Sequence, residues 1–536
     1  MSFDMSNRVA RKARAFCLTS AAVMVALHAT GALAQEGTRL PTIYYTASLS
    51  PVEAGRTGVS ASVLTQDALA GSAIRSLPLF LSSQAGVSAT QNGGLGTTGS
   101  VRLRGLGGGY LATRLDGIDV TDPTGTQISF NFGQVTTLGL DRVEIVRGSQ
   151  SALHGSEAIG GLITLSTFRP TRDGLSGATQ MEVGSFDTAS AATSIGYRDA
   201  GTEAAVTIAR TISEGFSTLS NNDEADGFDG TFLSYHLARD ITDTLRVGVT
   251  GHLRDNWAEF DESSLATGSF EEAETRAHRL FVAADLGMTS HELAYSKADF
   301  DRVSTSGLWG ATPFDGARAE WLYTGHWAGT GDLALNWGLE SSEESYLGAY
   351  DGGASTTNAA FGEAMWAAND ALDLSFAWRL TDHDSFGSHN TWRVAAAYRA
   401  SEALTLRGVA ATGFTAPSPY QRFSDSGHDG LTPETSESVE IGADYAFAGG
   451  ATVSATVFDT TVSDRIDYVN GAGPCASSWG CYRQIPGETR SQGIELSASL
   501  PLGAAWVLDA ITPIPKPKPT MTSPCRACRS RPSIWA

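Results

Sequence analysis

The chain has 536 residues, a formal net charge of −21 and 59 glycines. Lysine and arginine total 37 against 58 acidic residues, so the basic surface expected of a nucleic-acid-binding protein is absent. No apolar run after residue 34 is long enough for a transmembrane helix, which excludes helical membrane proteins. Transmembrane β-barrels stay open, because their strands show only alternating hydrophobicity.

Residues 1–34 have the pattern of a secretory signal peptide. Four basic residues lie between positions 8 and 14, residues 16–27 are mostly apolar, and Ala32-Leu-Ala34 forms a cleavage site before Gln35. The alternative is a membrane anchor, but the apolar run is too short for one. We therefore expect export, and residues 35–47 as a short segment on the periplasmic side.

Residues 48–169 form one compositional block, predicted to be a small mixed α/β domain. We expect a short helix over 68–81 interrupted at Pro78, and a helical turn over 151–159. Strands are predicted over 100–106, 111–120 with a turn at Asp116-Gly117, 141–146 and 162–167. The G-x-G-x-x-G motif at 94–99 lacks the preceding strand and following helix of a dinucleotide site, so its glycines are assigned to tight turns.

From about residue 170 to 510, long segments alternate between apolar and polar residues. Val439, Ile441 and Ala443 alternate with Glu440 and Asp444, and several other segments repeat this pattern. One apolar face and one charged face fit strands with a lipid-facing outside and a wet lumen. A soluble antiparallel sandwich also alternates, but these segments are long, numerous and charged at mid-strand.

An acidic loop interrupts the alternating segments at residues 222–228. It resembles part of a Ca²⁺ loop, although the twelfth position would be Leu233 where an EF-hand has glutamate. Two readings stay open here, a set of oxygen ligands gathered from separate hairpins or an ordinary solvated loop.

The cysteines beyond the signal peptide form two pairs. Cys475 and Cys481 lie in a Gly/Pro/Ser-rich stretch, and in an oxidising compartment their spacing predicts a disulfide that closes a small loop. Cys525 and Cys528 form a lone C-x-x-C motif, which is weak evidence for zinc or redox chemistry.

Residues 511–536 differ from the rest of the chain. They hold six of the 18 prolines and no acidic residue, and the prolines follow a segment that begins like a strand. A polyproline tail is one reading. We prefer a translational frameshift near Ala510, because a shifted frame can encode an acidic strand and turn. No catalytic constellation is apparent, and we predict that the chain is not an enzyme.

Several of these motifs together resemble the TonB-dependent outer-membrane receptors. The TIYYTA sequence at 42–47 resembles the TonB box, and DGID at 116–119, RVEIVRG at 142–148 and GSEAIGG at 155–161 resemble the plug signature. GFTAP at 413–417, LTPE at 431–434 and RSQGIE at 490–495 resemble late-barrel motifs. The resemblance implies a 22-stranded transmembrane β-barrel filled by an N-terminal mixed α/β plug, in the outer membrane of a Gram-negative bacterium.

The resemblance also implies partners and a cargo. The TonB–ExbB–ExbD complex would pull on the TonB box, whose residues here are Thr42, Ile43, Tyr44, Tyr45, Thr46 and Ala47. Outer-membrane lipid and lipopolysaccharide would surround the barrel, and no nucleic acid is expected. Within the family the chain is most similar to the cobalamin transporters, so the implied cargo is a corrinoid. A ferric siderophore is the alternative, and a non-transporting product of a broken gene, or a barrel enzyme or adhesin, are further ones.

Cobalamin transporters hold Ca²⁺ in their early loops as a structural ion. By motif match its ligands here would be Asn222, Glu224, Asp226, Asp255 and Asp261, although Ser217 stands near the place of another aspartate ligand. No other cofactor is expected, and the residues that contact the cargo cannot be read from the sequence. If the frameshift is real, about six of 22 strands are missing, and the unpaired edges would make stable insertion unfavourable.

Overall fold

The computed structural model describes residues 42–125, 130–220, 224–262, 268–329, 331–349, 351–471, 473–502, 507–512 and 518–520. The predicted signal peptide and the Cys525/Cys528 pair lie outside these ranges. Within them, no helix is long and apolar enough to cross a membrane.

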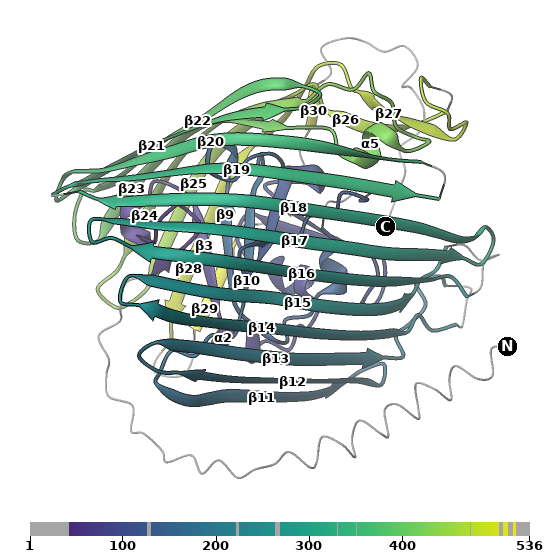
Figure 1. Ribbon diagram of the computed structural model, residues 1–536, viewed down its shortest axis with the longest axis horizontal. Helices are drawn as coiled ribbons and strands as arrows, with labels where there is room; N and C mark the ends of the chain where they lie inside the picture. The colour runs from purple at the N-terminus through teal and green to yellow at the C-terminus, as the bar shows by residue number, and fades with distance from the viewer. Residues whose placement is uncertain are drawn as a thin grey trace.

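A single large antiparallel sheet curls around the molecule (Figure 1). Its order has 18 strands in the described part of the chain. Each strand from β11 to β24 pairs with the next one in sequence, and β25 pairs with β28. The strands are β11 (Gly174–Gly184), β12 (Thr188–Arg198), β13 (Thr202–Ser213), β14 (Phe228–Thr242), β15 (Leu245–Glu259), β16 (Phe270–Asp285), β17 (Thr289–Ser306), β18 (Gly310–Ala328), β19 (Leu333–Gly348), β20 (Gly352–Asn369), β21 (Leu372–His383), β22 (Gly387–Arg399), β23 (Leu404–Thr415), β24 (Glu434–Ala446), β25 (Thr452–Ser463), β28 (Glu488–Pro501), β29 (Val507–Ile511) and β30 (Lys518–Thr520).

The last strands of this sheet share one partner. β29 pairs with the end of β28 at residues 497–501, and β30 pairs with its start at 488–490. The strand expected before the proline-rich stretch is thus present as β29, and three residues of that stretch also pair with β28. Between the described residues, no register joins β11 to β28, β29 or β30.

The alternation predicted from the sequence sets which side chains face outward. Ile441 is 68% exposed, whereas its neighbour Glu440 is 5% exposed. The same inversion separates Trp392 from Arg393 and Ile494 from Glu495. Apolar side chains outside and charged ones inside exclude the soluble sandwich and match a barrel with a polar interior.

The two ends of the barrel differ in the length of their connections. At one end, two residues join β14 to β15 and two join β20 to β21. At the other end, residues 214–227, 416–433 and 464–487 form long connections, the last of which carries the hairpin β26 (Ile466–Asn470) and β27 (Gly480–Gln484). Short turns are periplasmic and long loops extracellular in outer-membrane barrels, which orients the molecule.

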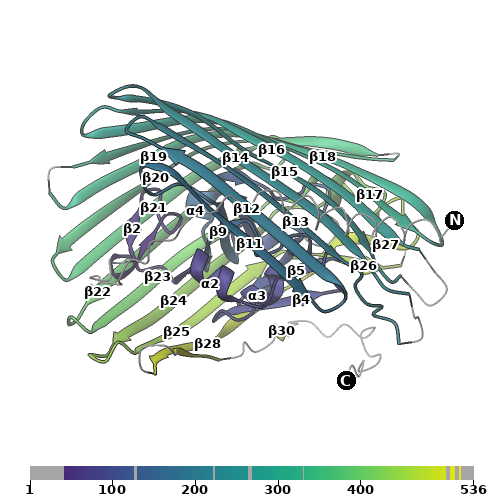
Figure 2. The same cartoon turned by 90° about the horizontal axis from the view of Figure 1, so that it is seen from below.

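The N-terminal block folds as a plug inside this sheet (Figure 2). A five-stranded sheet has the order β3-β9-β10-β7-β8, and a second sheet has the order β4-β5-β6. Their strands are β3 (Ala61–Thr65), β4 (Val87–Gln91), β5 (Gly99–Leu103), β6 (Leu106–Gly107), β7 (Leu111–Leu115), β8 (Ile118–Asp119), β9 (Leu140–Arg147) and β10 (Gly161–Thr167). Helices α2 (Gln66–Gly71), α3 (Leu77–Leu81) and α4 (Ser151–His154) complete the plug, and the short hairpin β1 (Ile43–Tyr44) and β2 (Val52–Glu53) precedes it.

The plug has its own apolar core, formed by Leu77, Leu81, Leu103, Ile145 and Leu165 together with their neighbours. One prediction about it was wrong. Pro78 does not interrupt a helix over 68–81 but begins α3, because proline lacks the N–H that the first helical turn leaves unpaired. The helical turn predicted over 151–159 is also shorter, since Gly155 at φ +80° ends α4.

Candidate functional site

The segment predicted to couple to a partner, residues 42–47, lies at the short-turn end of the barrel. Ile43 and Tyr44 form β1, which pairs with Val52 and Glu53 of β2 through a two-residue ladder. The cavity between this segment and the wall is also lined by Ala328 and Leu333, which flank a short turn. The segment therefore faces the periplasm.

One plug carboxylate holds the middle of this segment. Glu144 of β9 accepts hydrogen bonds from the backbone N–H of Tyr45 at 3.0 Å, and from the N–H and hydroxyl of Thr46 at 3.1 and 2.7 Å. Arg142 pairs with the same carboxylate at 2.7 Å and lies 4.9 Å from the ring centre of Tyr45. Since Glu144 is 2% exposed, these donors satisfy a carboxylate that water does not reach.

A buried histidine adds a further contact to the segment. His154 of α4 lies with its Nε2 3.0 Å from the carbonyl oxygen of Thr46. Burial lowers the pKa of His154 to about 3, and Arg114 adds to the effect. The ring is therefore neutral at physiological pH, and its Nε2–H donates to the carbonyl.

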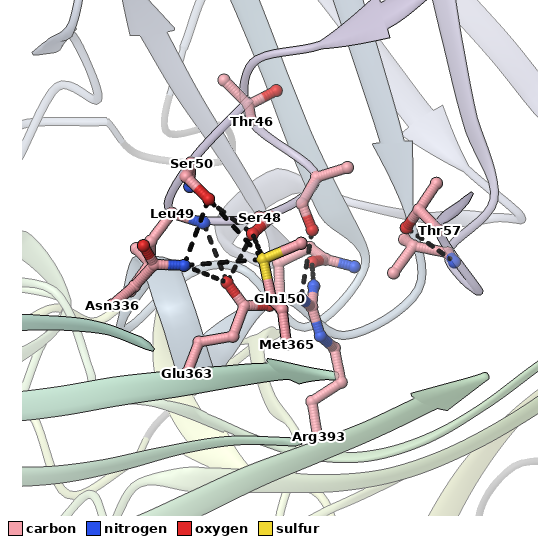
Figure 3. A network of polar contacts seen from close by, with 12 residues as sticks. Thr46, Ser48, Leu49, Ser50, Thr57, Gln150, Asn336, Glu363, Met365 and Arg393 are labelled. Carbon is pink, nitrogen blue, oxygen red and sulfur yellow. Dashed lines mark hydrogen bonds and ion pairs between the residues drawn. The ribbon is translucent and has the colours of Figure 1, made fainter. Parts of the chain in front are cut away.

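The barrel wall holds the end of the segment (Figure 3). Glu363 of β20 accepts hydrogen bonds from the hydroxyl of Ser48 at 2.5 Å and the N–H of Leu49 at 3.0 Å. Arg393 of β22 pairs with Glu363 at 2.9 Å and donates to the carbonyl oxygen of Ala47 at 3.0 Å. Arg393 also donates to the side-chain oxygen of Gln150, which belongs to the plug.

Ion pairs also join the plug to β24 and β28 of the wall, farther along the sheet from β22. Arg104 of the plug pairs with Glu440 of β24 at 2.6 Å and with Glu495 of β28 at 2.9 Å. Its guanidinium also lies 4.6 Å from the ring centre of Phe458. All three charged side chains are at most 8% exposed, so this cluster fixes the plug against the wall.

A second cluster surrounds Arg318 of β18. Its guanidinium contacts Asp119 at 3.1 Å, Glu344 at 2.8 Å and Glu157 at 3.4 Å. Burial raises the pKa of Glu157 to about 8, although Arg318 opposes the rise. Arg318 of the wall thus contacts two carboxyl groups of the plug, Asp119 and Glu157.

The plug apex at residues 92–98 packs against the acidic loop at the extracellular end. A Cβ built on Gly94 would lie 3.8 Å from the carbonyl oxygen of Asp226, and one built on Gly96 would overlap the ring of Phe228 at 2.3 Å. Gly96 also has φ +82°, so glycine is required there for both reasons. The plug apex and the acidic loop therefore form one surface.

The predicted Ca²⁺ ligands are only partly brought together. Asp226 is 4% exposed, its Oδ2 accepts no hydrogen bond from the described residues, and burial and the nearby Asp261 raise its pKa to about 7. Asp261 accepts hydrogen bonds from the Ser217 hydroxyl and from residues 218–219. Glu224 contributes to the raised pKa of Asp226. Asn222 lies outside the described residues.

Asp255 does not belong to this group. It is exposed on β15, on the face opposite to the buried Asn256. Within the described ranges, no three acidic, histidine or cysteine side chains are placed to hold a metal ion. Of the predicted ligands, Asp226 and Asp261 lie beside each other.

An extracellular hairpin is tied to the plug through one carboxylate. Glu434 accepts hydrogen bonds from the hydroxyl of Tyr110 in the plug at 2.7 Å and from the N–H of Ile466 in β26 at 2.5 Å. In the same connection a disulfide joins Cys475 and Cys481, whose Cα atoms are 5.8 Å apart. This hairpin thus has two fixed points, one covalent and one on the plug.

Sequence reasoning placed Glu440 on the polar face of its strand but did not find its partner Arg104. It missed Glu144 and Glu363, which hold the segment. A signal existed for both, since each is an acidic residue flanked on both sides by apolar or small residues, VEI and GEA.

Comparisons with known proteins follow the same division of the chain. The family described as "TonB dependent receptor-like, beta-barrel" matches residues 167–514, and "TonB-dependent Receptor Plug Domain" matches residues 53–162. The vitamin B12 transporter BtuB of Vibrio vulnificus is 25% identical over 401 residues, which cover 72% of this chain. The match spans 64% of that transporter's own length.

Two further proteins carry an iron-related description. The iron-regulated outer membrane virulence protein of Vibrio cholerae is 27% identical over 500 residues, covering 83% of this chain and 73% of that protein. The crystal structure of the siderophore receptor PirA from Acinetobacter baumannii superposes with a TM-score of 0.69 at 16% identity, covering 83% of this chain and 78% of that one. The latter likeness concerns the fold alone.

Proposed function

Because this chain belongs to the TonB-dependent receptor family of Gram-negative outer membranes, we propose that it actively imports a corrinoid. The proposed partner is the TonB–ExbB–ExbD complex, which would draw energy from the inner membrane. Members of this family are receptors and transporters, not enzymes.

One observation carries the transport proposal, namely that residues 42–47 are joined to the plug through Glu144. A pull on this segment from the periplasm reaches β9, the strand between β3 and β10 in the five-stranded sheet. The segment suits such a partner, since its β-branched and aromatic residues can add as a strand to another sheet.

The corrinoid proposal is supported by the relatives and by the surface at the plug apex. Vitamin B12 transporters match most of the chain, although at only 25% identity. The neighbouring carboxyl groups of Asp226 and Asp261, beside the plug apex, support the proposal of a structural Ca²⁺ that would order this surface for a cargo. A ferric siderophore is the second candidate, supported by the iron-regulated relative.

Binding of labelled cyanocobalamin to outer-membrane vesicles that carry this protein tests the cargo. We expect saturable binding that EDTA weakens and added Ca²⁺ restores, with the Asp226→Asn variant insensitive to both. Saturable binding without any EDTA effect would keep the corrinoid and remove the Ca²⁺ proposal. No binding by folded protein would overturn the corrinoid proposal, and ferric siderophores would be measured in the same vesicles.

Uptake by whole cells tests the coupling segment. Tyr45→Pro removes the N–H that donates to Glu144, and it also prevents the segment from pairing as a strand. We expect Tyr45→Pro to lose uptake but keep cargo binding. The control Tyr45→Phe should keep both uptake and binding. Normal uptake by Tyr45→Pro would refute the assignment of residues 42–47.

A further inference from the structure

We propose that Glu363 and Arg393 of the barrel wall act as a clamp that sets how often residues 42–47 become available to a periplasmic partner. These two residues are called the wall clamp below. The inference rests on the proposed function, because it concerns the same segment. It assigns a positioning role to two wall residues, which contact the backbone of Ala47 and Leu49 and the hydroxyl of Ser48.

The hydrogen bonds of the wall clamp are divided between the wall and the segment. Glu363 is paired with Arg393 and accepts a weaker bond from Asn336 at 3.3 Å, both on the wall. Its other two donors, the Ser48 hydroxyl and the Leu49 N–H, come from the two residues that directly follow the segment. Because bonds to a charged acceptor are stronger than neutral ones, the clamp adds appreciably to the hold on the segment.

Both wall side chains are almost fully buried, Glu363 at 0% and Arg393 at 1%. The two opposite charges compensate each other, so neither is left unpaired in the wall when the segment departs. A cavity of about 550 Å³ between the segment and the wall, lined by Ser48, Ser50 and Glu363 among others, gives water a place beside the pair. Opening is therefore costly but reversible.

The segment is held by two bodies at once. Glu144 belongs to the plug and Glu363 to the wall, and their donors Thr46 and Ser48 are separated only by Ala47. Arg393 also reaches the plug through Gln150, whose N–H is bonded to the carbonyl oxygen of Ala158. A shift of the plug relative to the wall cannot keep all these contacts, so it would release one end of the segment.

Thiol labelling of Ala47→Cys measures the opening directly. Ala47 is 1% exposed, so a maleimide reaches a cysteine there only when the segment has left the wall. The protein without this substitution gives the background from its native cysteines. Two variants are then made in the Ala47→Cys protein. Glu363→Gln removes the clamp's negative charge, and Ser48→Ala removes one donor while leaving the wall pair intact.

We expect each variant to label about tenfold faster or more, as loss of a hydrogen bond to a charged group predicts. The matched control is Glu320→Gln, which breaks another buried plug-to-wall pair, Arg114–Glu320 at 3.1 Å, without touching the segment. It should change labelling by less than about twofold, because distant sites are nearly independent. Faster labelling in all three variants would show general loosening of the plug and overturn the proposal.

Two outcomes separate this inference from the proposed function. If Ser48→Ala labels no faster than its parent while the parent imports its cargo, the wall clamp is refuted and the transport proposal stands. If both clamp variants label faster but no cargo is bound or imported by any form, the clamp stands and the proposed function fails. Ser48→Ala keeps the test valid if Glu363→Gln does not fold.

Discussion

Replacing Arg104 should strongly weaken the contact between the plug and strands β24 and β28 of the barrel wall. Its guanidinium satisfies Glu440 and Glu495 at once, and both glutamates are nearly inaccessible to water. Arg104→Met keeps the apolar stem but leaves two buried carboxylates without their cation. Removing one partner of a buried ion pair costs about 3–5 kcal/mol. Because Arg104 already has φ +53°, methionine adds no new backbone cost.

Hydrogen exchange measured by mass spectrometry in detergent micelles checks this value. At about 1.4 kcal/mol for each factor of ten, the exchange of β5 and β6 amides should accelerate roughly a hundredfold or more. Peptides from β17 on the wall serve as the internal reference and should not change. Arg104→Lys should be intermediate, since lysine keeps the charge but lacks the fork that reaches two carboxylates.

A compensating variant separates charge from packing. Arg104→Met combined with Glu440→Gln and Glu495→Gln removes the uncompensated charges and should recover most of the lost protection. Unchanged exchange in Arg104→Met, or no recovery in the triple variant, would refute the electrostatic reasoning.

Three further predictions follow from the same structure. Gly148→Ala should also speed exchange in β5 and β6, because its Cβ would lie 1.9 Å from Glu440 Oε1 and Gly148 has φ +75°; unchanged exchange would contradict this steric account. The acidic loop should lose stability as pH rises from about 4 toward 7, since a folded pKa of about 7 for Asp226 means that the folded loop binds the proton more tightly than the unfolded one. Trp257 fluorescence in Ca²⁺-free buffer, taken as the difference from Trp257→Phe, reports this, and Asp226→Asn should abolish the dependence. Reducing the Cys475–Cys481 disulfide should raise exchange in β26 and β27 but not in β25, because the reduced chain regains loop entropy; equal exchange before and after reduction would count against it.

The wall of the barrel was predictable because its strands obey a rule with a period of two residues. The alternation of Val439, Ile441 and Glu440 predicts their faces without any knowledge of their neighbours. The same rule applied to β15 would have corrected one ligand prediction. Leu253 is exposed on the outer face, and Asp255, two residues later, must share that face.

The partners of the inner-face charges were not predictable from the chain. Arg104 and Glu495 are 391 residues apart, and nothing in their local sequence selects one of them for the other. Their meeting depends on how the plug is rotated within the barrel, which many weak contacts decide together. The rotation of the plug also decides that residues 42–47 contact both Glu144 and the wall clamp. The motif therefore predicted a role for this segment but not the residues that hold it.

The way residues 42–49 are attached determines how they respond to mechanical force. In the hairpin of β1 and β2 the incoming and outgoing chains leave from the same end, so tension on the N-terminus opens its two rungs as a zipper. The next bonds, to Glu144, then Arg393 and then Glu363, follow in chain order and are loaded one after another. Bonds broken in series need only the force of the strongest single step, whereas bonds sheared together need their sum. A weak but sustained pull can therefore detach this segment while the plug sheet, whose strands would have to slide together, stays folded.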